Sequence, residues 1–132
     1  MKTPKTTPSE PLLQAVNISK GGTIVARRVE WAGTSERRRR GLLGREHMDP
    51  EEGIYIVPCK WIHMFGMKFP IDVAFLAADG RVLAVHHTLK PNRLSRIGFR
   101  AEGVLELPAG RLRATDTAVG DTIQFRELEA SS

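Results

Sequence analysis

The chain has 132 residues and a net charge of +5, and this length fits a single domain. Its one cysteine, Cys59, excludes an internal disulfide and suits a reducing compartment. No apolar run reaches the roughly 20 residues that a membrane helix needs, and the start, MKTPKTTPSEP, has no apolar stretch typical of a secretory signal, so we predict a cytoplasmic protein without a membrane segment.

The first third of the chain predicts a tail, a hairpin and a short helix. Residues 1–11 read as a flexible tail. The apolar-rich segments 12–18 and 23–31 are separated by the turn residues Ser-Lys-Gly-Gly, which indicates an opening β-hairpin. Thr34 or Ser35 suits a helix N-cap, and the glycines at 41 and 44 keep the predicted helix short, at about residues 35–43.

The rest of the chain predicts short strands separated by turns. Asp79-Gly80 indicates a hairpin between residues 71–76 and 81–88. Further strands are expected at 54–57, 103–107 and 122–128, an extended piece at 61–64, a loop at 89–100 and a helical turn at 109–116. This pattern favours a mainly β domain over residues 12–128, followed by a tail at 129–132. The fold class is a compact barrel or jelly-roll-like sandwich with one or two short helices, one of which plugs an end or covers an edge.

Two acidic residues, Asp72 in IDVAFL and Glu106 in GVLELPAG, stand inside apolar strands. Because both faces of each strand are largely apolar, we expect both carboxylates to be at least half buried. A buried carboxylate must find a partner or change its pKa. Each acid is therefore either structural, held by backbone amides or by an arginine such as Arg45, or part of a chemical site.

The segment IHMFGMKFP, just before Asp72, brings together soft and aromatic side chains. His63 is either a hydrogen-bonded core residue or a ligand-binding group, and it shares an extended face with Phe65 and Met67. Thioethers such as that of Met67 fill irregular core gaps and also line adaptable binding surfaces. The His, Cys, Asp and Glu residues show no local spacing typical of a metal motif, so we predict no metal and no cofactor.

A run of four arginines, Arg37, Arg38, Arg39 and Arg40, covers a full helical turn. The run is interpreted first as a solvated surface. Binding of nucleic acid by this run, together with the basic loop at residues 90–100, is the weaker interpretation.

Several motifs together resemble a known family. ERRRRGLLGRE, HMFGMKFPIDVAFLAADGRVLAV, VLELPAG and VGDTIQF are similar to the prokaryotic family called domain of unknown function 192, over about residues 36–125. The resemblance implies a compact β-rich domain of jelly-roll or barrel type, with no established biochemical activity. It also implies that four residues act together, with Arg45 nearby: His63, Met67, Asp72 and Glu106.

The residues support three hypotheses of function. The first is a small-molecule-binding domain with a pocket around Asp72, Glu106, His63 and Met67, whose ligand would be cationic or hydrogen-bond donating if the acids are ionised. The second is a hydrolase using Asp72 or Glu106 as acid or base. The third is nucleic-acid binding through the arginines. Phe65 and Arg45 are further candidates for the pocket, and the oligomeric state is not predicted.

Overall fold

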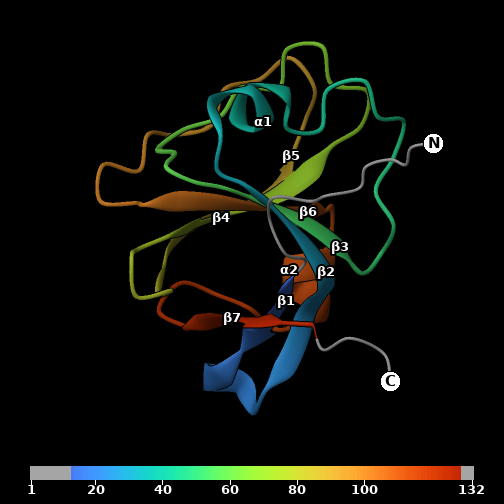
Figure 1. Ribbon diagram of the computed structural model, residues 1–132. Helices are drawn as coiled ribbons and strands as arrows, with labels where there is room; N and C mark the ends of the chain where they lie inside the picture. Colours follow the sequence, from blue (N-terminus) through green and yellow to red (C-terminus); the bar gives the residue numbers. More distant parts are fainter. Residues whose placement is uncertain (1–12, 129–132) are drawn as a thin grey trace, which may run out of the picture.

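The computed structural model describes residues 13–128, and within them it shows one seven-stranded sheet with two short α-helices (Figure 1). The strand order is β5-β4-β6-β3-β2-β1-β7, and all neighbours pair antiparallel except β2 and β3. The elements are β1 (Leu13–Asn17), the 3-10 turn η1 (Ile18–Lys20), β2 (Thr23–Ala32), α1 (Ser35–Arg40), β3 (Glu52–Ile56), β4 (Ile71–Leu76), β5 (Val82–Leu89), β6 (Gly103–Pro108), α2 (Arg111–Ala114) and β7 (Ile123–Glu127). The predicted tails, residues 1–11 and 129–132, lie outside the described residues.

The predicted mainly β fold with one or two short helices is confirmed, with two α-helices present, and both predicted hairpins are present. In the first, Asn17 of β1 faces Thr23 of β2. In the second, β4 and β5 pair around the Asp79-Gly80 turn, where the Ala77 amide donates to the carbonyl of Arg81 (3.0 Å). Each hairpin places apolar residues of two strands on a common face, because directly opposed residues of an antiparallel pair point the same way.

The helix α1 begins where the sequence predicted and ends three residues early. The Thr34 hydroxyl accepts a hydrogen bond from the Arg37 amide (3.1 Å), as expected of an N-cap. The helix ends because Gly41 has a φ of 47° and a ψ of −122°, a conformation that only glycine adopts readily. The next four residues form a turn that lies over the sheet.

The sheet curls into a half-barrel whose two ends meet at one turn. The turn between β4 and β5 contacts the start of β7: the Ile123 amide donates to the Gly80 carbonyl (2.9 Å) and the Val82 amide donates to the Asp121 carbonyl (2.8 Å). Arg81 and Thr122 also form an isolated antiparallel bridge. The edge strands β5 and β7 are therefore tied together over a short length.

Buried side chains form two cores, one on each face of the curled sheet. The inner core fills the concave side and includes Leu105, Leu107 and Leu112, the last from α2. The outer core lies on the other side, where Val73 and Phe75 pack with residues of the turn after α1 and of the long loops, such as Leu42 and Met64. In Figure 1, α1 and its loops stand on one side of β4, β6 and β3, and α2 stands on the other. This arrangement explains why β4 is apolar apart from Asp72: both of its faces are buried.

Candidate functional site

Glu106 belongs to the outer core, and it has no partner there. On β6 it lies opposite Val73 of β4 and opposite Ile54 of β3, both of which are outer-core residues. The Glu106 residue is only 5% exposed. Within residues 13–128, no hydrogen bond or ion pair reaches its carboxyl group. A buried carboxyl without a protein partner is unusual, because leaving it unpaired costs free energy.

The Glu106 carboxyl lies at a hollow of about 200 Å³, which we call the outer hollow. Its walls come from the end of α1, from the turn after it, and from the loop between β3 and β4. The lining residues are Arg38, Arg39, Gly41, Leu42, Leu43, Ile56, Pro58, Cys59, Trp61, Ile62, His63, Met64, Met67 and Glu106. The hollow is thus mainly apolar, with a buried acid, a thiol, an imidazole and two arginines as its polar groups.

Burial controls the electrostatics of the outer hollow. It raises the pKa of the Glu106 carboxyl to about 8, because the apolar surroundings disfavour the ionised form. Glu106 is therefore mostly protonated at neutral pH, and a protonated carboxyl both donates and accepts hydrogen bonds. Burial also raises the pKa of the free Cys59 thiol, whose Sγ donates to the Trp61 carbonyl (3.1 Å). A thiol of this kind is a poor nucleophile.

His63 and Met67 line the outer hollow, whereas Phe65 does not. The segment around His63 is extended and pairs with the loop before β6: His63 and Leu94 form an isolated bridge. The Phe65 ring stacks on the His63 ring at 5.0 Å between centroids and is 51% exposed. Phe65 is thus placed to orient the imidazole from outside the hollow, not to contact its contents.

The structure does not bring Asp72 to the outer hollow. Asp72 lies opposite Leu107, an inner-core residue, so it stands on the other face of the sheet from Glu106. Its two carboxylate oxygens accept hydrogen bonds from the Thr88 amide (2.9 Å) and from the Leu112 amide (3.0 Å). The expected meeting of the two acids does not occur, because neighbouring positions on paired strands alternate between faces. The sequence shows this alternation within each strand but not the register between them.

Of the other charged residues predicted for a site, some form ion pairs and some line the outer hollow. Arg45 forms an ion pair with Glu52, with both carboxylate oxygens at 2.8 Å from its Nη2, and it does not line the outer hollow. Arg37 pairs with Glu30, on β2. Arg38 donates to the Gly33 carbonyl (2.8 Å). Of the four arginines of α1, only Arg38 and Arg39 line the hollow, so the run does not form one uniform patch.

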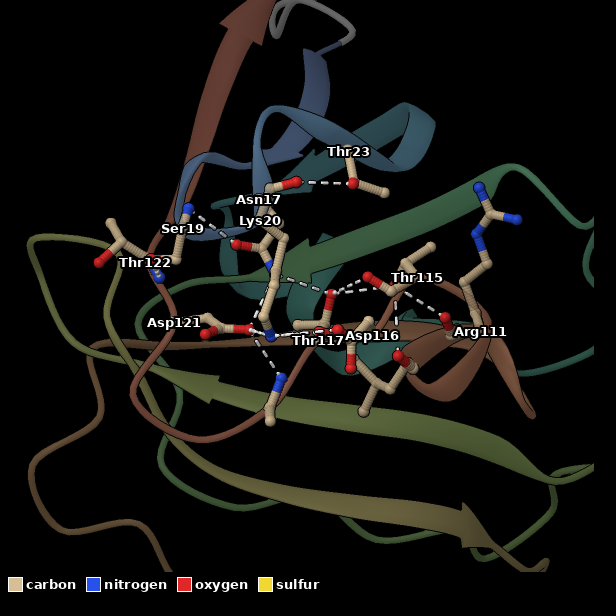
Figure 2. A network of polar contacts seen from close by, with 12 residues as sticks. Asn17, Ser19, Lys20, Thr23, Arg111, Thr115, Asp116, Thr117, Asp121 and Thr122 are labelled. Carbon is tan, nitrogen blue, oxygen red and sulfur yellow. Dashed lines mark hydrogen bonds and ion pairs between the residues drawn. The ribbon is translucent and has the colours of Figure 1, made fainter.

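A polar network at the other end of the molecule was not recognised from the sequence as a unit (Figure 2). Its centre is Asp121, whose Oδ2 accepts hydrogen bonds from Asn17 Nδ2 (3.0 Å), Lys20 Nζ (2.9 Å) and the Ala118 amide (3.0 Å). Burial works against ionisation, but the bonds from Asn17 and Lys20 outweigh it and hold the pKa of Asp121 below its usual value. In the sequence, the VGD motif, which ends at Asp121, was the signal that pointed to this network. The network joins η1 to the start of β7 and is structural.

Two further structural findings concern the described part of the chain. Between residues 13 and 128, no group of three or more His, Cys, Asp or Glu side chains is arranged to hold a metal ion. None of the helices in this range has the length and apolarity required to cross a membrane.

These features define a class of small β-protein, in which a curled sheet carries a hollow with a buried acid under a short arginine-rich helix. A family model described as DUF192, Uncharacterized ACR, matches residues 16–125, so the chain belongs to the domain of unknown function 192 family. The resemblance drawn from the motifs is thereby confirmed. No curated protein matches the chain at a significant level.

Two crystal structures share the fold. A Sinorhizobium meliloti 1021 protein, described as a candidate transcription regulator, is 24% identical, with a TM-score of 0.74 over 92% of this chain and 98% of that one. A Novosphingobium aromaticivorans DSM 12444 protein of unknown function is 23% identical, with a TM-score of 0.76 over 93% of each chain. At this level of identity the likeness shows the fold alone.

Proposed function

We propose that this protein is a non-catalytic binding domain for a small organic molecule, and that the ligand occupies the outer hollow. The observation that carries the proposal is Glu106, a residue that is 5% exposed and lies at the wall of a hollow, and whose carboxyl has no protein partner within residues 13–128. A ligand that completes the hydrogen bonds of this carboxyl gains affinity from a site already formed.

The residues that line the outer hollow indicate which chemical groups the ligand should carry. A protonated Glu106 pairs best with a group that both accepts and donates, such as an amide or a carboxylic acid. The apolar body of the ligand would contact Met64, Met67 and Leu42. Arg38 and Arg39 at the same hollow favour a ligand whose free end is negatively charged. Its negative charge distinguishes this ligand from the cationic or hydrogen-bond-donating one expected for ionised acids.

The hydrolase hypothesis is less well supported by this geometry. A pair of carboxylates working as acid and base must flank one substrate, and Asp72 and Glu106 lie on opposite faces of the sheet. Both Asp72 oxygens also accept backbone amides. In the proposal the protein works in the cytoplasm, where the free Cys59 stays reduced.

The first prediction uses methionine side chains as natural probes of the outer hollow. A thermal-shift screen of small amides and organic acids at pH 6.5 should find compounds that stabilise the protein. With methyl-labelled methionine, a hit should move the NMR signals of Met64 and Met67, which line the hollow, and leave that of Met48 in place.

Glu106→Leu should abolish both responses, whereas Glu127→Gln, an exposed change on β7, should preserve them. A hit that stabilises Glu106→Leu as well as the wild type would contradict the proposal. So would a hit that moves Met48 and not Met67, or the lack of any hit in the screen.

A further inference from the structure

A second hollow, of about 310 Å³, lies at the opposite face of the sheet, and we call it the inner hollow. It opens between the turn that joins β4 to β5 and the strand β7, where the half-barrel closes. Its lining residues are Ile18, Trp31, Tyr55, Ala77, Ala78, Asp79, Gly80, Glu102, Thr122, Ile123, Gln124 and Phe125. It shares none of these residues with the outer hollow.

Three aromatic rings from three strands meet at the inner hollow. Trp31 on β2 and Tyr55 on β3 have ring centroids 4.9 Å apart at 59°. Phe125 on β7 lies 5.7 Å from Trp31, at 83°, and 4.7 Å from Tyr55, at 40°. Rings set at such angles present faces in different directions, and an aromatic face carries partial negative charge.

The charges at the inner hollow are of one sign. Asp79 and Glu102 line it, and no Lys, Arg or His does so among the described residues. This is notable in a chain with a net charge of +5. Acidic side chains beside aromatic faces create a local environment that attracts cations and repels anions.

Tyr55 supplies a further observation that points to a ligand. The residue is 4% exposed and lines the inner hollow. Within the part of the chain that the structure describes, nothing donates to its hydroxyl or accepts from it. A buried phenol ordinarily has a partner, and its oxygen is free to accept a hydrogen bond from an N–H or to contact a methylated cation.

We propose that the inner hollow binds a small ammonium compound. The cation would lie against the faces of Trp31 and Phe125, with Glu102 as its counter-ion and the Tyr55 oxygen beside it. The volume is near the lower limit for small-molecule pockets, which favours a compact ligand. This site is independent of the function proposed for the outer hollow.

Choline and its neutral isostere, 3,3-dimethyl-1-butanol, test the proposal directly. The protein has two tryptophans, Trp31 at the inner hollow and Trp61 at the outer one. In Trp61→Phe, fluorescence therefore reports on Trp31 alone. At constant ionic strength, we expect choline to change this signal in a saturable way and the isostere to have no effect. In the wild type, only the Trp31 indole N–H signal should move by NMR, which requires no substitution.

Variants then separate the aromatic from the ionic contribution. Phe125→Leu and Glu102→Gln should each weaken choline binding by about threefold to tenfold. Glu127→Gln, a neighbouring acid that does not line the hollow, should bind as the wild type does. The proposal is overturned if choline and the isostere act equally, if only Trp61 responds, or if no saturation occurs up to about 100 mM choline.

Discussion

At the scale of single residues, two acids that look alike in the sequence have opposite environments. Asp72 accepts two backbone amides and is satisfied, whereas Glu106 has no partner among the described residues. The difference arises from the face on which each side chain lies. The inner face at Asp72 offers free amides at the start of α2, and the outer face at Glu106 offers only apolar groups and the hollow.

The raised pKa of Glu106 makes a prediction about stability and pH. Its folded value of about 8 lies above the value in the unfolded chain, so the folded state holds a proton that the unfolded state has lost. The contribution of Glu106 to stability is therefore complete below about pH 4 and is lost as the pH rises through 8. The loss between pH 5 and pH 8 should be roughly 3 kcal/mol.

Denaturant unfolding at several pH values checks this prediction. Glu106→Gln cannot ionise, so its stability should decline less than that of the wild type over this range, and it should be the more stable protein at pH 8. Glu102→Gln, an exposed change, should follow the wild type. Parallel curves for the wild type and Glu106→Gln would show that Glu106 is ionised throughout.

At the scale of elements, Asp72 of β4 connects its strand to the end of β5, through Thr88, and to the start of α2, through Leu112. The Leu112 amide is in the first turn of α2, where backbone donors lack partners inside the helix. The N-cap residue, Gly110, has no side chain that could accept them. Asp72 supplies the missing acceptor from β4, and its charge is favourable at a helix N-terminus.

Asp72→Asn should therefore destabilise the fold by roughly 1–3 kcal/mol, because one oxygen is replaced by an amide that faces a backbone donor. Unfolding in denaturant measures the loss, and amide hydrogen exchange at Leu112 and Thr88 should become faster. The exposed turn variant Asp79→Asn is the control, with little change in either measurement. Unchanged stability and exchange in Asp72→Asn would mean that the two hydrogen bonds contribute nothing.

The hairpins and the α1 cap could be predicted from the sequence because their signals are local. Asp79-Gly80 indicates its own turn, and Thr34 caps the helix that follows it by accepting from an amide three residues later. The cap of α2 could not be predicted in this way, since Asp72 lies 40 residues before Leu112. For the same reason the network around Asp121 joins Asn17 to a residue 104 positions later and was missed.

At the scale of the whole molecule, closure of the half-barrel depends on a close approach of two backbones. Gly80 has a φ of 90°, and a Cβ there would overlap the carbonyl oxygen of Ile123. The same place forms one wall of the inner hollow. Gly22 has a similar φ of 89°, but its Cβ would meet open space. Substituting Gly22 therefore measures the cost of the backbone conformation alone, whereas substituting Gly80 adds the cost of disturbing the closure of the half-barrel.

Gly80→Ala should destabilise the protein clearly more than Gly22→Ala, which bears only the conformational cost of about 1 kcal/mol. The Ile123 amide, which donates to the Gly80 carbonyl, should also exchange faster with solvent in Gly80→Ala and remain protected in Gly22→Ala. If both variants lose the same stability and keep that amide protected, the contact between the turn and β7 is not needed for closure.

The sequence by itself determined the mainly β class, the two hairpins, the arginine-rich helix and the burial of two acids, because each depends on neighbouring residues and on the alternation of side chains along a strand. It also indicated His63, Met67, Asp72 and Glu106 as residues of one region. Only the tertiary structure decided that Asp72 stands on the other face and that aromatic rings from β2, β3 and β7 meet at a second hollow. Both depend on strand register and on the curl of the sheet, which join residues far apart in the chain.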